Sequence, residues 1–209
     1  MSSTNLESYD SIALRWNEHR SELSPAELRI LSMLVDGLER ESVILDLGCG
    51  TGRPVATHLA AAGFRICGVD QSPAMLALAQ ARLPAHQWIR AEIENYAFET
   101  TFAAAIAWDS LFHIPRAHHG EIFTRLRQAL PSGGRFALTA GGSDHPAFAD
   151  TMFDRKFFYD SHPPAVTVTL LEQAGFRVQH QEYLNHPDGA REKGRIAVVA
   201  AAPWRKPLR

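Results

Sequence analysis

The chain has 209 residues, 45% hydrophobic and 21% charged, which excludes an intrinsically disordered protein and supplies enough apolar residues for one domain. Lysine and arginine, at 21, nearly balance aspartate and glutamate, at 23, for a net charge of −2, which argues against a general nucleic-acid binder. No signal peptide or membrane span is expected, because residues 1–10 are polar and no run approaches about 18 apolar residues. The two cysteines lack metal spacing and make no disulfide scaffold, so we expect a cytoplasmic protein.

The hydrophobic pattern predicts helices and strands in alternation. Helices are expected over residues 6–20, 25–38, 54–62, 73–82, 116–130 and 164–174. Strands are expected over residues 42–47, 65–69, 87–90, 102–107, 135–140, 176–178 and 196–200. The second helix has a strong start signal, because Ser24 precedes Pro25 and Glu27 stands where a capping box requires it. Such alternation predicts a parallel sheet covered on both faces, although the last two strands lack an intervening helix and could pair antiparallel.

A glycine-rich turn after the first strand carries the main chemical signal. Gly48, Gly50 and Gly52 lack a Cβ and tolerate positive φ, so the backbone there can approach a ligand closely. Asp70 ends the second strand, and an acidic residue at that place accepts hydrogen bonds from the ribose hydroxyls of a nucleotide. The two elements together predict a nucleoside-containing ligand, and the alternative is a purely structural turn.

The motifs around this turn distinguish between ligand classes. In the dinucleotide fingerprint Gly-x-Gly-x-x-Gly, the third glycine would stand at Arg53, and the phosphate loop Gly-x4-Gly-Lys-Ser/Thr is absent. Residues 43–52 (VILDLGCGTG) and 68–76 (GVDQSPAML) instead closely resemble the first and second motifs of the class I S-adenosylmethionine (SAM)-dependent methyltransferases. The turn at 131–134 before the fifth strand also matches. The likeness is to the small-molecule, methyltransferase-11/25-like members, and it extends from about Tyr9 to the end of the chain.

The resemblance implies a fold and a domain organisation. The fold is α/β and Rossmann-like, with a seven-stranded, mostly parallel sheet, an antiparallel last strand and helices on both faces. One domain would span residues 1–209, with an N-terminal helical lid at 1–41 and a SAM-binding core at 42–142. Residues 143–209 would form an acceptor-side segment and the C-terminal strands.

The resemblance also implies cofactor contacts. They are Tyr9, Asp46, Gly48, Cys49, Gly50, Gly52, Asp70, Gln71, Met75, Glu92, Ile93 and Trp108. The glycine turn would lie along the methionine part of SAM, and Asp46 would hold the turn or the amino group of SAM. Asp70 would bind the ribose hydroxyls, Glu92 and Ile93 would border the adenine, and Trp108 would lie near the methionine end. Met75 would pack near the adenosine, or it belongs only to the core.

Residues 9–16 resemble the N-terminal segment that closes over SAM in many small-molecule members. Tyr9, Ala13 and Trp16 share one helical face. The other interpretation is an amphipathic helix that packs against the sheet edge, and both can hold together.

His113 is the candidate catalytic residue. It follows the fourth strand at the expected rim of the acceptor site, and histidine titrates near neutral pH. A base is needed only if the acceptor must lose a proton, and His113 could instead pack or hydrogen-bond near SAM. His118 and His119 are expected to face water. No metal site is expected, because the histidines lack HExxH or comparable spacing.

Residues 141–162 are rich in aromatic side chains. In the resembled family this segment often contributes to the acceptor pocket, which suggests a small and partly apolar acceptor, although such aromatics can also be core. The chain is therefore interpreted as an enzyme that transfers a methyl group from SAM to a small molecule by in-line displacement, as a monomer or homodimer without nucleic-acid or membrane partners. The alternatives are a methyltransferase for RNA or protein and a non-catalytic SAM-binding protein.

Overall fold

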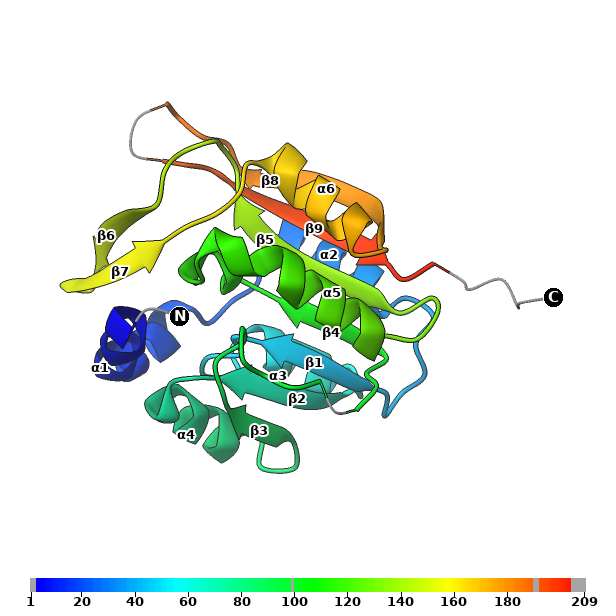
Figure 1. The fold of residues 1–209 in the computed structure, drawn as a ribbon. Helices are drawn as coiled ribbons and strands as arrows, with labels where there is room; N and C mark the ends of the chain where they lie inside the picture. The colour runs from blue at the N-terminus through cyan, green and yellow to red at the C-terminus, as the bar shows by residue number, and fades with distance from the viewer. Residues whose placement is uncertain (1–2, 99, 190–191, 204–209) are drawn as a thin grey trace.

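The computed structural model describes residues 3–98, 100–189 and 192–203. Seven strands form one sheet in the order β3-β2-β1-β4-β5-β9-β8 (Figure 1). They are β1 (Val43–Leu47), β2 (Arg65–Asp70), β3 (Gln87–Arg90), β4 (Ala104–Ala107), β5 (Arg135–Gly141), β8 (Arg177–Asn185) and β9 (Arg195–Ala201). The pairs from β3 to β5 are parallel, and β9 lies antiparallel between β5 and β8. The predicted seven-stranded, Rossmann-like sheet with an antiparallel last strand is confirmed.

Helices cover both faces of this sheet. They are α1 (Ser3–His19), α2 (Pro25–Val35), α3 (Val55–Ala61), α4 (Pro73–Arg82), α5 (His119–Ala129) and α6 (Pro164–Gln173). In β1, Ile44 joins one buried cluster with α2 and α3, whereas Leu45 joins the other with α5 and α6, because successive strand residues point to opposite faces. Among the described residues, no helix has the length and apolar character needed to cross a membrane.

Local signals explain where the elements begin. The capping box at α2 is confirmed: the Glu27 amide donates to Ser24 Oγ at 3.3 Å, and the Ser24 amide donates to Glu27 Oε2 at 2.8 Å. Ser72 caps α4 in the same way, since its Oγ accepts from the Met75 amide at 3.1 Å. These caps fix where the two helices begin.

Some predicted boundaries were wrong. The helix expected over 116–130 begins as 3₁₀ turns at Leu111–His113 and Arg116–His118, and α5 starts only at His119. The strand expected at 176–178 is β8, which continues to Asn185 with exposed and half-buried residues in alternation. An edge strand that is half-buried on one face carries many polar residues, so its sequence lacks the continuous apolar run of a central strand.

A second, two-stranded sheet was not predicted. It is a hairpin of β6 (Phe148–Met152) and β7 (Arg155–Tyr159), joined through Phe153 and Asp154, which both have positive φ. Figure 1 shows the hairpin beside α1, where both stand off from the main sheet. Asn5 and Ser8 of α1 bond to the backbone of β7. The two segments therefore form one wall beyond the carboxyl ends of the central strands.

Candidate active site

The glycine turn lies against the end of β4. Gly48, Gly50 and Gly52 have φ of 77°, 52° and 73°, values that L-residues with side chains rarely adopt. A Cβ on Gly48 would come 2.3 Å from Ser110 Cβ. Glycine is thus required at position 48 by both conformation and space, and the turn presents bare backbone to the neighbouring cavity.

Asp70 is fixed by the backbone on both of its sides. Its Oδ2 accepts from the Gly50 amide and its Oδ1 from the Ser72 amide, each at 2.9 Å. Burial raises the pKa of this carboxyl, and the backbone hydrogen bonds oppose that rise. The two carboxylate oxygens have about four acceptor positions, and the backbone amides of Gly50, Ser72 and Gln71 use three of them, so Asp70 can still accept a bond from a ligand hydroxyl.

Asp46 is the next-to-last residue of β1, which leads into the same turn. Its side chain is buried, and burial together with the charge of Asp70 raises its pKa to about 7. A cation placed beside Asp46 would stabilise the carboxylate form. The site therefore favours a ligand with a positive group close to Asp46 and Asp70.

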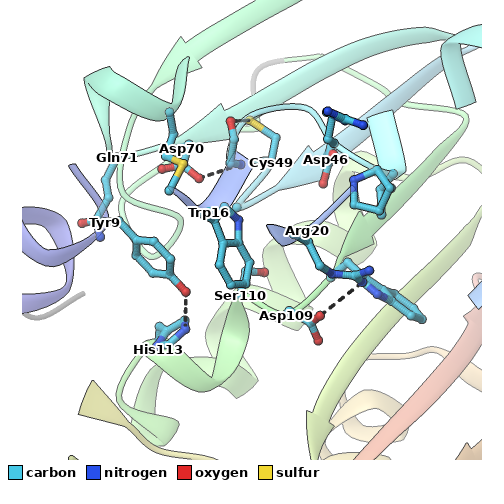
Figure 2. A pocket seen from close by; sticks show the side chains of 17 residues that line it. Tyr9, Trp16, Arg20, Asp46, Cys49, Asp70, Gln71, Asp109, Ser110 and His113 are labelled. Atoms are coloured by element: carbon cyan, nitrogen blue, oxygen red, sulfur yellow. Dashed lines mark hydrogen bonds and ion pairs between the residues drawn. The ribbon is translucent and has the colours of Figure 1, made fainter. Parts of the chain in front are cut away.

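One cavity brings these groups together, and we call it the cofactor cavity because residues predicted to contact a cofactor line it (Figure 2). Its lining includes these residues predicted from the sequence: Tyr9, Asp46, Gly48, Cys49, Gly50, Asp70, Gln71, Met75, Trp108 and His113. Gly52, Glu92 and Ile93 do not line it. Gly52 packs near Trp88, Ile93 is buried close to Gly48, and Glu92 is exposed and bonds to Asn95. Their cofactor contacts stay predictions.

Other lining residues were missed at the sequence level. They are Arg20, Arg53, Pro54 and Val55. The cavity is also lined by Trp16, Asp109 and Ser110, which lie close in sequence to the predicted residues Tyr9 and Trp108. Arg53 to Val55 follow the turn directly, so their closeness in sequence was an available signal. Arg20 gives no such signal, because only the path of the chain between α1 and α2 brings it to the cavity.

Four charged residues form a network at one end of the cavity. Arg195 Nη1 donates to Asp109 Oδ1 and Oδ2 at 2.6 and 2.5 Å, and Arg20 Nη2 lies 3.6 Å from Asp109 Oδ2. Arg20 also pairs with Glu27. Burial acts to raise the pKa of Glu27, but hydrogen bonds from Ser24 and Trp108 and the charge of Arg20 lower it overall. Trp108 Nε1 donates to Glu27 at 3.0 Å. The network of paired charges therefore fixes the positions of both Asp109 and Trp108.

His113 has both ring nitrogens engaged. Nδ1 lies 2.9 Å from the Phe158 carbonyl oxygen, which can only accept, so Nδ1 carries the proton. Nε2 therefore accepts from the Tyr9 hydroxyl at 2.7 Å. Burial lowers the pKa of His113 to about 4. Figure 2 shows Tyr9 and His113 side by side on one side of the cavity.

Helix α1 is anchored over the glycine turn and α4. Asp10 accepts from the Ala74 amide at 3.1 Å and from the Ser72 hydroxyl. Arg82 of α4 donates to Asn17 Oδ1 at 2.6 Å and to the Thr51 carbonyl oxygen. The helix expected as a lid thus carries Tyr9 and Trp16 into the cofactor cavity.

Comparison with known proteins agrees with this geometry. Residues 44–134 match a family model whose description is "methyltransferase domain". Trans-aconitate 2-methyltransferase of Escherichia coli O7:K1 is 38% identical over 102 residues, which are 48% of this chain and 40% of that protein. The chain therefore matches less than half the length of these curated relatives.

Solved structures share the fold. Magnesium protoporphyrin IX methyltransferase of Synechocystis PCC 6803, solved with bound SAM, has a TM-score of 0.70 and 17% identity, covering 94% of each chain. The 1,6-didemethyltoxoflavin-N1-methyltransferase of Burkholderia thailandensis, solved with bound 1,6-didemethyltoxoflavin and S-adenosylhomocysteine, has a TM-score of 0.69 and 22% identity, covering 95% of this chain and 85% of that one. The resemblance to class I SAM-dependent methyltransferases is confirmed, and SAM is the cofactor of this class of enzyme.

Proposed function

We propose that the chain binds SAM in the cofactor cavity and transfers its methyl group to a small molecule. The observation that carries this proposal is the juxtaposition of the Gly48–Gly52 turn and Asp70. The turn leaves room that any side chain at Gly48 would fill, and the carboxylate is held by two backbone amides. Both features suit a nucleoside whose sugar hydroxyls need acceptors.

The donor set also fits the rest of SAM. Asp46, with its raised pKa, suits a ligand ammonium group. Arg20 lines the same cavity, but its guanidinium is already paired with Glu27 and Asp109, so we assign no ligand group to it. Gly52, Glu92 and Ile93 complete the proposed contacts through the turn and the adenine side, as the resemblance implies.

Methyl transfer from SAM requires the protein mainly to position the two reactants. When bound, SAM supplies a methyl group on a positively charged sulfur, which becomes a neutral thioether when the methyl leaves in line with the attacking atom. Holding two reactants in attack geometry can contribute about 7–11 kcal/mol to lowering a barrier. Tyr9 and Trp16 cover the cavity from α1 and limit the entry of water.

In this proposal His113 is a positioning residue. Its Nδ1 donates to Phe158 and its Nε2 accepts from Tyr9, so no lone pair remains to take a proton from an acceptor. The imidazole instead orients the Tyr9 hydroxyl, whose oxygen retains acceptor capacity toward the cavity. A direct base role for His113 would first require the bond to Tyr9 to break.

The remaining expectations stay proposals. The lid at 1–41, the core at 42–142 and the acceptor side at 143–209 form one working unit in a cytoplasmic monomer or homodimer, with a small-molecule partner and no nucleic acid. The near-neutral net charge supports a small acceptor. Size-exclusion chromatography with light scattering tests the oligomeric state.

Calorimetry with SAM, S-adenosylhomocysteine and NADH tests the cofactor. We expect both sulfur nucleosides to bind with one site per chain and NADH to give no heat above dilution. Protein that ignored SAM yet bound NADH would overturn the proposal. Incubation with methyl-labelled SAM and fractionated metabolite pools then tests transfer, with label in a small-molecule fraction as the expected result and label only in RNA or protein as the contrary one.

A further inference from the structure

A second cavity adjoins the cofactor cavity, and we call it the ring-walled cavity. Its volume is about 410 Å³, within the usual range of small-ligand pockets. It lies between the end of β5, the β6–β7 hairpin and the chain around Arg195. Phe112, Phe148 and Tyr159 line it together with His145.

Pairs of side chains in contact separate the two cavities. Asp109 faces the cofactor cavity and is bonded to Arg195, which lines the ring-walled cavity. His113 faces the cofactor cavity, and its ring centroid lies 4.8 Å from that of Tyr159. A molecule in the ring-walled cavity therefore lies behind Arg195 and Tyr159, which contact Asp109 and His113 at the end of the cofactor cavity.

Aromatic rings form a continuous wall in this cavity. Phe148 and Tyr159 are opposite each other in the hairpin, with centroids 5.2 Å apart and planes at 14°. Phe112 follows at 6.0 Å from Tyr159, and the His145 ring meets Phe148 edge-on at 5.1 Å. Such a wall favours flat, polarisable ligands, because ring pairs contribute about 0.5–1.5 kcal/mol beyond their buried area.

Polar groups at the wall suit a ligand hydroxyl or ring nitrogen. His145 Nδ1 donates to the Pro146 carbonyl oxygen at 2.9 Å, so Nε2 carries the lone pair. Burial and the charge of Asp150 raise the pKa of Tyr159 to about 12, so its hydroxyl keeps its proton at neutral pH. The wall thus combines one acceptor and one donor.

The charges beside the cavity do not suit a polyanion. Arg195 is paired with Asp109, and Arg116 is paired with Asp160. Asp150 and Glu192 add two carboxylates to the lining, and Lys193 adds one ammonium group. An aliphatic polycarboxylic acid would find both arginines already bonded to carboxylates.

We propose that the ring-walled cavity is the methyl-acceptor site and that it takes a planar aromatic molecule against Phe148 and Tyr159. This inference rests on the proposed function and specifies its substrate class. The reacting group of the acceptor points toward Asp109 and His113, and these side chains move aside when acceptor and cofactor meet, because in-line attack needs the reacting atoms about 3–3.5 Å apart.

The test uses the full chain saturated with S-adenosylhomocysteine and ligand-observed NMR titrations. The planar probes are catechol, quinolin-8-ol and 7-hydroxycoumarin; the saturated match to catechol is cis-1,2-cyclohexanediol, and trans-aconitate is the aliphatic acid. At least one planar probe should bind, at least tenfold more tightly than the diol and trans-aconitate. If none of the three binds better than those two, the proposal is wrong.

Two matched variants test whether the probe binds in the ring-walled cavity. Phe148→Leu keeps an apolar side chain but removes the ring, and should weaken the planar probe about three- to tenfold. Phe153→Leu, in the same hairpin, is the control, because Phe153 faces Arg15 and His19 of α1. Equal affinity in both variants would place the probe elsewhere and overturn the assignment. Calorimetry with S-adenosylhomocysteine on the same samples separates this failure from failure of the proposed function, since only the latter abolishes nucleoside binding.

Discussion

Asp70 joins three parts of the site through one carboxylate. It accepts from the glycine turn and from the residue that caps α4, and it lines the cofactor cavity. Asp70→Asn replaces one acceptor oxygen with a donor, so it should lose a charge-assisted bond to a ribose hydroxyl, worth about 1.5–3 kcal/mol. We expect S-adenosylhomocysteine to bind at least tenfold more weakly in calorimetry.

Asp36→Asn is the matched control for this prediction. Asp36 is a largely exposed carboxylate that follows α2 and pairs with Arg135 away from the cavity. Its replacement should leave nucleoside affinity unchanged. If Asp70→Asn and Asp36→Asn bound the nucleoside equally well, the proposed sugar contact would be wrong.

The Tyr9–His113 pair separates a positioning role from a base role. Tyr9→Phe keeps the ring contacts with Trp16 and Phe157 but removes the hydroxyl that His113 Nε2 accepts from. If His113 positions Tyr9, kcat for labelled methyl transfer should fall at least tenfold while nucleoside affinity changes less than threefold. If His113 is the base, freeing Nε2 should leave kcat unchanged or raise it.

At the scale of single residues, the sequence predicted those site residues that belong to one short, contiguous motif. Asp46, Gly48 and Asp70 belong to contiguous motifs whose backbone course is set by strand, turn and helix signals. The network of Arg20, Glu27, Asp109 and Arg195 could not be predicted, because its members come from four segments that meet only after folding. His119 was wrongly expected to face water. It is buried, and its Nε2 lies within hydrogen-bond distance of the carbonyl oxygens of Leu111 and Ile114, which makes burial of the ring possible.

Among the elements, α1 has the most direct control over the cofactor cavity. Asn5 is fully buried and joins α1 to β7, donating to the Phe158 carbonyl oxygen at 3.1 Å and accepting from its amide at 2.7 Å. Asn5→Ala leaves the Phe158 amide unpaired, which costs about 1–3 kcal/mol. We expect α1 to be cleaved at least threefold faster in limited proteolysis, with weaker nucleoside binding.

Leu14→Ala provides the comparison for Asn5→Ala. Leu14 lies on the same helix, but 69% of its surface is exposed, so its loss should change neither cleavage nor affinity. Equal cleavage of Asn5→Ala and Leu14→Ala would show that α1 is held by other contacts.

Nucleoside bound by the wild-type protein should slow cleavage of α1, because Tyr9 and Trp16 line the cofactor cavity.

Elements with a continuous apolar pattern were predictable, and elements at the acceptor side were not. The central strands β1 and β4 are buried on both faces, so their composition alone marks them. The β6–β7 hairpin has half-buried strands and a turn of Phe153 and Asp154, without the Asn-Gly or Asp-Gly pair that usually signals such a turn. Its aromatic content indicated a pocket, but only the fold shows which rings share it.

For the molecule as a whole, buried titratable groups give stability two opposing dependences on pH. Burial lowers the pKa values of His113 and His119 to about 4, below the unfolded value of about 6.5. The unfolded chain then binds more protons between these values, so these histidines reduce stability as pH falls. Asp46, with its pKa raised to about 7, binds its proton in the folded state and reduces stability as pH rises through the same range.

His119→Gln isolates one of these contributions at a distance from the cofactor cavity. Because Nε2 of His119 faces two carbonyl oxygens, it is a donor, and a glutamine amide can replace it without a titrating group. Between pH 7 and pH 4 the wild-type protein should lose about 3 kcal/mol more unfolding free energy than the variant. Urea unfolding at a series of pH values measures this difference. His118→Gln, at an exposed neighbouring position, should track the wild type, and parallel curves for wild type and His119→Gln would mean that His119 does not remain neutral in the folded protein.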